Sequence, residues 1–388
     1  MSRVDALIEE LCPNGVEHKA LGDVGAFIRG NGLQKKDLTD AGIPAIHYGQ
    51  VHTHYGIWTT ETISFVTSEF AKRLRKAQPG DLIVATTSED DAAVGKAVAW
   101  LGDREAAVSG DAYIFRHSLD SKYVAYFFQS EQFQDQKRRG ITGTKVRRVS
   151  GESLGKIRIP VPPLEVQREI VRVLDLFTTL EAELEAELEA RRRQYAHYRD
   201  EILTFGGWSR WVPMAQVVTI GTGSRNTNEA VHGGRYPFFV RSQDPLTIDE
   251  FEFDEVAVVT AGDGVGVGKV FHFVDGRYSL HQRAYRLCVK SDALLPKFLF
   301  HFIRHDFARY LAMTSVHASV TSLRKPMFER FPVPLPALAE QERIVAILDK
   351  LDALVSDLSV GLPAELAARR KQYEYYRDRL LTFKEAVA

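Results

Sequence analysis

The chain has 388 residues, a net charge of −1 and 45% hydrophobic residues, as in an average soluble protein. Its length exceeds the roughly 100 to 200 residues of one domain, so two or more globular units are expected. No stretch approaches the roughly 18 apolar residues of a membrane span, and no signal peptide is recognised, so a cytoplasmic location is expected. The only cysteines, Cys12 and Cys288, are too few for a disulfide framework or a cysteine-built zinc site.

Residues 1–163 are predicted to form a mixed α/β globular unit with a curved sheet. The β-branched runs Asp81–Thr86 and Val98–Leu101 predict strands, and turn residues separate them. One aromatic helix is predicted over Tyr123–Phe133. Strands and helices do not alternate regularly, so a sheet built from parallel βαβ units is not indicated.

Histidines gather in the segment Ile46–Gly56, at His47, His52 and His54. Alternate residues of a strand point to one face, which raises the possibility of metal ligands. No carboxylate or cysteine completes a zinc pattern, so metal is the weakest of three interpretations. The segment is either an ordinary strand and turn or a loop that contacts bases or phosphates.

The clearest charge feature is the segment Asp135–Arg158, which holds eight basic residues against two acidic ones. Such a run is often a solvated face. Here it is interleaved with Gly, Thr and Ser, which contact phosphates without steric bulk, and this favours a loop that tracks a phosphate backbone.

A long helix is predicted from Leu164, directly after a Pro-rich strand ending that cannot lie inside a helix. Apolar residues recur at spacings of three, four and seven through Phe205, which predicts a helix of about 40 residues, roughly 60 Å long. Residues 164–205 carry ten acidic residues against six basic ones. Such a helix is marginal alone and needs a partner for its apolar stripe.

Residues 206–337 repeat the first globular unit in weaker form. Asp81–Trp100 aligns without gaps with Asp254–Phe273, and both contain Val-Gly-Lys followed by an apolar strand. The runs Asp254–Thr260 and Lys269–Val274 are the strands predicted here. The further matches are Ala112–Tyr113 with Ala284–Tyr285, the aromatic helix with Phe298–Phe307, and Thr142–Val146 with Val316–Val320.

The Gly-rich stretch Ala261–Val270 is not a phosphate-binding P-loop. Asp263 stands where the motif needs Gly, Val270 stands where Ser or Thr should bind magnesium, and a strand follows instead of a helix. The stretch is predicted to be a tight loop between strands, which is either only a turn or also touches the backbone of a ligand. The nearby segment Leu280–Leu287 is a polar strand edge or part of the same contact surface.

Residues 338–388 repeat the long helix. Arg191–Phe205 and Arg369–Phe383 are identical at 10 of 15 positions, and the second copy has four extra residues near Gly361–Pro363. A kink or brief break is expected there. Two matching amphipathic helices in one chain favour a mutual coiled coil over two solvated linkers.

These repeated blocks carry a family resemblance. Each copy has a Pro-rich strand, then Gln-Arg/Glu-x-Ile-Val, then Arg-Arg-x-Gln-Tyr-x-x-Tyr-Arg-Asp-x-x-Leu-Thr-Phe. Gly361–Asp378, Ile46–Gly56, Tyr236–Asp244 and the stretches GDGVGVGKVFHF and LHQRAYRL add to it. Over its whole length the chain resembles the specificity (S) subunit of Type I restriction-modification systems.

The resemblance implies an α/β (mixed α+β) fold with pseudo-two-fold symmetry. Two target recognition domains, residues 1–163 and 206–337, would be joined by two long antiparallel coiled-coil helices, residues 164–205 and 338–388. Each domain would read one half of a bipartite double-stranded DNA target. Rigid helices tens of ångströms long can span a turn of B-DNA, which is near 34 Å.

The resemblance also implies the partners. Two methyltransferase (M) subunits and the restriction (R) subunits would do the chemistry, with S-adenosylmethionine and ATP bound only there. The chain itself is expected to be no enzyme and to need no cofactor or metal, because no helix-borne His-Glu pair, nucleophile elbow or Asp/Asn-Pro-Pro-aromatic signature was found. The alternatives are a coiled-coil scaffold that binds no DNA and a fragment of a fused restriction enzyme.

The candidate DNA-binding residues are polar side chains on loops that the repeat relates. In the first domain they are Tyr48, Gln50, Thr87, Ser88, Lys96, Lys145, Arg147 and Arg148. In the second they are Arg241, Ser242, Gln243, Asp263, Lys269, His281, Gln282, Arg283, Ser319 and Arg324.

Overall fold

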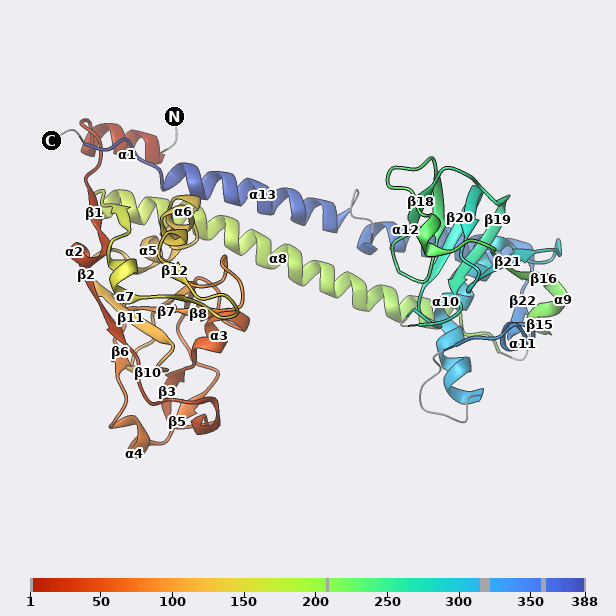
Figure 1. The fold of residues 1–388 in the computed structure, drawn as a ribbon, viewed down its shortest axis with the longest axis horizontal. Coiled ribbons are helices and arrows are strands. Elements are labelled where there is room, and N and C mark those ends of the chain that lie inside the picture. Colours follow the sequence, from red (N-terminus) through yellow and green to blue (C-terminus); the bar gives the residue numbers. More distant parts are fainter. Residues whose placement is uncertain (1–2, 207–208, 265, 315–321, 357–360, 387–388) are drawn as a thin grey trace. The chain divides into compact units, whose positions relative to one another are not determined.

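The computed structural model describes residues 3–206, 209–264, 266–314, 322–356 and 361–386 (Figure 1). The chain folds as two compact units. Unit 1 contains Met1–Leu184 and Leu366–Ala388, and unit 2 contains Glu185–Glu365. Among the described residues, no helix has the length and apolar character needed to cross a membrane.

Unit 1 is a mixed α/β unit built from short strands. These are β1 (His18–Ala20), β2 (Gly25–Arg29), β3 (Ile43–Ile46), β4 (Trp58–Thr59), β5 (Phe65–Val66), β6 (Lys76–Ala77), β7 (Leu82–Ala85), β8 (Thr87–Ser88), β9 (Ala97–Trp100), β10 (Ala106–Val108), β11 (Ala112–His117), β12 (Ile141–Thr142), β13 (Arg147–Val149) and β14 (Arg158–Pro160). Their sheets have the orders β2-β11-β7-β9-β4, β5-β3-β10-β6, β12-β13-β8 and β1-β14.

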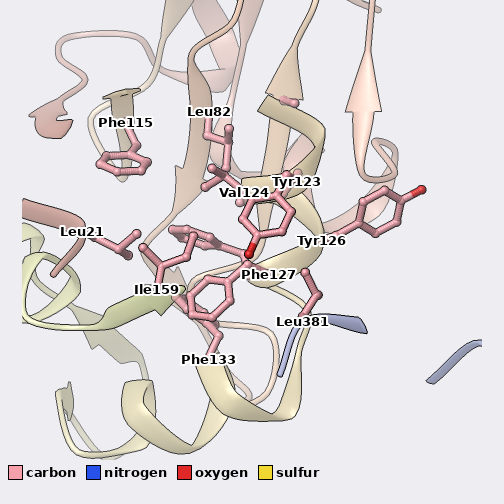
Figure 2. Close-up of a cluster of buried hydrophobic side chains, with 14 of the residues drawn as sticks. Leu21, Leu82, Phe115, Tyr123, Val124, Tyr126, Phe127, Phe133, Ile159 and Leu381 are labelled. Atoms are coloured by element: carbon pink, nitrogen blue, oxygen red, sulfur yellow. The ribbon is translucent and has the colours of Figure 1, made fainter. Parts of the chain in front are cut away.

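Short helices surround these sheets. They are α1 (Arg3–Leu11), α2 (Leu21–Val24), the 3-10 helix η1 (Lys35–Asp37), α3 (Tyr48–Thr53), α4 (Ser68–Ala71), α5 (Ser121–Phe127), α6 (Glu131–Arg138) and α7 (Gly151–Gly155). The main core of unit 1 lies where α5 and α6 pack on β7 and β11. Figure 2 shows Tyr123 and Val124 of α5 between Leu82 of the sheet and Ile159, whereas the Tyr126 ring points away from Leu82 and Phe115. Each large apolar side chain buried there contributes about 1.5–3 kcal/mol.

Unit 2 is built around one six-stranded sheet. The strands of the whole unit are β15 (Arg210–Pro213), β16 (Val218–Thr222), β17 (Tyr236–Phe239), β18 (Leu246–Ile248), β19 (Phe253–Ala261), β20 (Phe271–Leu280), β21 (Ala284–Val289) and β22 (Pro332–Leu335). The sheet order is β16-β21-β19-β20-β17-β18, and β15 pairs with β22. The helices are α9 (Met214–Val217), η2 (Thr227–Glu229), α10 (Pro296–Thr314) and α11 (Lys325–Glu329).

The two units share the central part of one strand order, because β2-β11-β7-β9 of unit 1 corresponds to β16-β21-β19-β20 of unit 2, and this confirms the predicted duplication. Strands β4 and β6 of unit 1 have no counterpart in the six-stranded sheet. In unit 1, β3 pairs in parallel with β10, and in unit 2, β17 pairs in parallel with β20. The long strand β20 therefore takes the places of both β9 and β10. The strand β1 pairs with β14 as β15 pairs with β22.

The ungapped alignment of Asp81–Trp100 with Asp254–Phe273 is wrong in register. Ala85 pairs with Ala112, whereas Ala261 pairs with the equivalent Ala284. The alignment had placed Ala85 opposite Val258, so the strands are shifted by three residues. The loops between the equivalent strands differ in length, and an ungapped alignment cannot account for that.

The prediction of one aromatic helix over Tyr123–Phe133 is also wrong. The helix is interrupted between α5 and α6, where the Ser130 hydroxyl accepts a hydrogen bond from the Phe133 amide at 3.3 Å and caps α6. Ser at an N-cap satisfies an amide that would otherwise lack a partner. The equivalent helix α10 of unit 2 has His305 at this position and continues without a break.

The tail segments form long helices, as predicted. The helix α8 (Leu164–Ile202) has 39 residues. The second tail contains α12 (Leu338–Ser356) and α13 (Leu362–Leu380), and Gly361 between them has a φ of +79°, which glycine adopts most readily. The residues 357–360 of the expected break lie outside the described part of the chain.

Within unit 1, α8 and α13 pack in antiparallel fashion as a coiled coil. Phe177 stacks on Tyr376 with ring centroids 5.4 Å apart, and Arg370 Nε lies 2.6 Å from Glu181 Oε1. Residue numbers therefore increase along α8 while those of its partners on α13 decrease, which is the sign of an antiparallel pair. The apolar stripe that the sequence left without a partner is buried in this contact.

The end of each tail belongs to the unit formed mainly by the other repeat. Leu381, beyond α13, is fully buried in the core of unit 1. Its repeat equivalent, Leu203, follows α8 and is 2% exposed in the core of unit 2. Each globular core is thus completed by the tail of the other copy.

The start of each tail is held to its own globular unit by an aspartate and a glutamine at repeat-equivalent positions. Asp175 accepts from Lys122 Nζ and Tyr126 Oη, both at 2.7 Å. The repeat-equivalent Asp349 contacts Lys297 Nζ at 2.7 Å and His301 Nε2 at 2.8 Å. The buried amides of Gln167 and Gln341 bond backbone groups beside these contacts, including Pro162 O and Pro336 O at 2.8 Å.

Candidate nucleic-acid interface

In unit 1 the candidate residues gather where α3, the β7–β9 loop and the hairpin β12–β13 meet. The hairpin pairs with β8, so that Arg147 lies opposite Ser88 and Arg148 opposite Thr87. His52 on α3 contacts Thr87 O through Nε2 at 3.0 Å, and Lys96 Nζ donates to His52 O at 3.2 Å. The chain therefore brings residues from three separate segments to one edge of the unit.

The histidine segment is helical, so its interpretation as a strand and turn is wrong. The ring of His47 accepts from the Gly49 amide at 3.2 Å and caps α3. The His47 amide donates to Gln50 Oε1 at 2.9 Å, and this reciprocal capping box favours a helix. Burial lowers the pKa of both His47 and His52. No three potential metal ligands cluster among the described residues.

The candidate side chains of this edge differ in solvent exposure and in how many of their polar atoms already bond within the unit. Both polar atoms of the Gln50 amide are engaged inside the unit, because Nε2 also donates to Ser64 Oγ at 2.8 Å. Thr87 is 8% exposed, and burial lowers the pKa of Lys96. Tyr48 and Ser88 are half-buried.

The basic segment Asp135–Arg158 divides into structural and exposed residues. Lys137 is 1% exposed and donates to Val94 O at 2.7 Å, and burial lowers its pKa to about 8. Arg147 is half-buried, with Nε 2.8 Å from Asp91 Oδ1. Lys145 and Arg148 are exposed on the hairpin and are the side chains best placed to meet a phosphate backbone.

In unit 2, Asp263 joins two of the candidate arginines. Its Oδ1 lies 3.2 Å from Arg241 NH1, and its Oδ2 lies 3.0 Å from Arg283 NH1. Partial burial acts to raise the pKa of Asp263, but the hydrogen bonds from Arg283 and Arg241 outweigh burial and hold this pKa below its ordinary value. The carboxylate is therefore ionised at neutral pH and fixes both arginines.

The turn that carries Arg283 is fixed by the residues around it. His281 is 5% exposed, and its Nδ1 accepts from the Arg283 amide at 3.0 Å. The Gly262 amide donates to Arg283 O at 2.8 Å. Gln282 is exposed, and its side-chain amide donates to Asn226 Oδ1.

The remaining candidates of unit 2 are exposed or undescribed. Arg324, Gln243 and Lys269 are exposed, as is Ser242, whose hydroxyl donates to Asp244 O at 2.7 Å. Arg324 follows Leu323, whose amide donates to Gly262 O at 2.7 Å, so it lies near the Asp263 loop. Ser319, like the Val316–Val320 match, lies outside the described residues.

Sequence reasoning missed the residues that position the candidates. Asp91 holds Arg147, and Asn226 accepts from Gln282, yet neither was singled out. Asp91 lies in the loop between β7 and β9, where the ungapped match of the two copies is wrong in register, so the repeat did not point to it. Asn226 directly precedes η2 as its N-cap, and nothing in the local pattern indicated a link to Gln282.

The fold and its polar edges define a two-domain protein in which two repeat-related units are each joined to long helices. The model of the Type I restriction modification DNA specificity domain matches this chain twice, over residues 13–190 and 211–368. The chain therefore belongs to the Type I restriction-modification specificity family and carries two copies of its DNA specificity domain.

Two curated relatives agree with this assignment. The specificity subunit of the EcoR124I/EcoR124II Type I restriction enzyme of Escherichia coli is 32% identical over 263 residues, which is 61% of this chain and 65% of that protein. A putative Type I specificity subunit of Haemophilus influenzae is 28% identical over 318 residues, covering 75% of this chain and 78% of that protein. The match thus spans slightly less than two thirds of the first relative.

Solved structures show the same fold at low sequence identity. A chain from a structure of complex assembly and conformational transition of the type I R-M system superposes with a TM-score of 0.62 at 17% identity. That match covers 95% of this chain and 98% of the other. The mixed α/β units and long helices are therefore the architecture of that chain as well.

Proposed function

We propose that this chain is the specificity subunit of a Type I restriction-modification complex and that each unit reads one half of a bipartite DNA target. The observation that carries the proposal is the duplication of a DNA specificity domain within one chain. Two readers on one chain need a fixed separation, and we propose that the long helices set it. The division into recognition segments 1–163 and 206–337 and helical segments 164–205 and 338–388 is part of this proposal.

We further propose that the gathered polar edge of each unit is the DNA-reading surface. In unit 1 the exposed Lys145 and Arg148 suit phosphate contact, and Arg147 is held in place by Asp91. In unit 2, Arg241, Gln243 and Arg283 are exposed on neighbouring loops. Arginine and glutamine recognise base edges through paired hydrogen bonds, whereas lysine acts as a point charge on phosphate.

The partners follow from the family. We propose that the helices dock two methyltransferase subunits, which two-fold repetition would place equivalently, and that restriction subunits join this complex. S-adenosylmethionine and ATP would bind in those partners, and we propose a cytoplasmic location for the complex because its proposed target is DNA. Near-neutral net charge is tolerable because partner subunits would share the phosphate contacts.

The purified chain alone is expected to show no methyltransferase and no nuclease activity, because no catalytic signature was found in its sequence. The measurement is methyl transfer to DNA with S-adenosylmethionine, for the chain, for the partner methyltransferase subunit and for both together. Activity that appears only in the mixture agrees with the proposal. Methylation by the chain alone would show that it is a catalytic fragment.

Substitutions Arg147→Ala and Gln243→Ala are expected to weaken binding of the assembled complex to its target. A side chain that reads a base is worth about 1–3 kcal/mol, so each change should weaken binding by roughly 5- to 150-fold. Arg104→Ala is the matched control, because the Arg104 side chain is 63% exposed and its ion pair with the neighbouring Asp103, at 3.6 Å, is itself exposed to solvent. If both variants bind like the control, the residue assignment is wrong even though the family is right.

A further inference from the structure

The three residues Arg241, Asp263 and Arg283 of unit 2 form a cluster that places a carboxylate at the proposed DNA-reading surface. An acidic side chain at such a surface repels phosphates, so its presence needs a separate reason. Asp263 is only 19% exposed, and both carboxylate oxygens are occupied by arginine. The carboxylate therefore presents little charge to a ligand and instead orients the two guanidinium groups.

The guanidinium groups keep most of their hydrogen-bonding capacity. Each arginine contacts Asp263 through NH1, and the side chains of Arg241 and Arg283 are 45% and 64% exposed. A guanidinium has five N–H donors, so several donors of each group remain for a ligand. Paired donors from one planar group match the two acceptors O6 and N7 that guanine presents in the major groove.

The backbone that carries Asp263 and Arg283 is also fixed by hydrogen bonds. The backbone of Asp263 pairs with Ser322, and the neighbouring Gly262 is bonded to both Arg283 and Leu323. The buried ring of His281 accepts from the Arg283 amide. Fixing an arginine before binding removes part of the side-chain entropy that a free arginine would lose on binding.

We propose that Arg241 and Arg283 read guanine in the half-site of unit 2 and that Asp263 is the positioning residue that aims them. The proposal rests on the proposed function of the chain. Because both guanidinium groups share one carboxylate, the guanines lie within about two base-pair steps of ~3.4 Å each. The half-site read by unit 2 therefore contains at least one G·C pair at the positions these arginines reach.

The test uses the full chain in complex with its methyltransferase partner, and the readout is the methylated motif across a host genome. The variants are Arg241→Lys, Arg283→Lys and Asp263→Asn. Lysine keeps the charge but loses the paired donors, and asparagine can accept from one arginine only. Arg277→Lys is the matched control, because Arg277 pairs with Asp254 at 3.0 Å at the opposite end of β19 and both side chains are about half exposed.

Each arginine variant is expected to lower the preference for G·C about tenfold or more at one position of one half-site. Asp263→Asn should relax the same positions, and the other half-site and the Arg277→Lys motif should match wild type. A uniform loss of methylation with an unchanged motif would overturn the inference, because it would show phosphate contacts. A relaxed position that is not G·C would also overturn it. If the wild-type complex itself produces no bipartite motif, the proposed function fails instead.

Discussion

Insertion of four residues after Leu184 is expected to change the gap between the two half-sites by one or two base pairs. Four residues add about 6 Å to a helix and turn its stripe only slightly past one full turn. That length corresponds to one or two base pairs of ~3.4 Å. The inserted point lies beyond the Glu181–Arg370 contact of unit 1, and no candidate DNA-reading loop is touched. The half-site sequences should therefore stay the same.

Two matched insertions separate this effect from general damage. A two-residue insertion at the same point turns the stripe by roughly half a turn, so it should abolish methylation instead of moving the gap. Four residues inserted at Gly233, where a Cβ added to the glycine would meet none of the described atoms within 4 Å beyond its chain neighbours, should leave the gap unchanged. The measurement is the methylated motif of each complex. An original gap or an altered half-site after the Leu184 insertion would show that the helices do not set the distance.

Leu381→Ala is expected to destabilise unit 1 by about 2–5 kcal/mol, the usual cost of truncating a fully buried leucine. Leu381 comes from the end of the chain, yet it belongs to the same core cluster of unit 1 as Tyr123 and Phe127. Hydrogen exchange resolved by peptide is the measurement. Backbone amides of β7 and β11 should exchange faster, and those of β19 and β21 should be unchanged.

Leu203→Ala is the repeat-matched control and should give the opposite pattern, with faster exchange in β19 and β21 only. Leu203 is 2% exposed and packs in the core of unit 2. If Leu381→Ala leaves unit 1 unchanged, or if each variant loosens the unit of its own repeat, then the tails are not exchanged between the units as the structure shows.

Periodic features of the sequence predicted the architecture well. The spacing of apolar residues from Leu164 predicted a helix that the structure extends to Ile202, and the duplicated blocks predicted two repeat-related units. The order of the strands in their sheets could not be predicted, because it depends on pairings between distant segments. A periodic or repeated pattern is a reliable basis for prediction because many residues contribute to it, so one exceptional residue does not change the result. The exchange of Leu381 and Leu203 between the units was not predicted, because a repeat does not reveal which copy fills which core.

Secondary structure predicted from local sequence patterns was wrong where a single capping side chain determined whether a helix begins. Ser130 caps α6 and interrupts an otherwise continuous aromatic pattern, and the ring of His47 caps a helix in a segment that resembled a strand. The candidate site was predicted only as loops. The sequence could not show that Asp263 joins Arg241 to Arg283, because these residues meet only when three separate segments fold together.

Methylome sequencing tests the central claim most directly. A host that lacks the chain and a host that carries it with its methyltransferase partner are compared. The account predicts that the chain adds one methylated motif, made of two short specific sequences separated by a fixed unspecified gap. Addition of a single undivided motif, or of no motif at all, would contradict the claim that the two units read two halves of one DNA target.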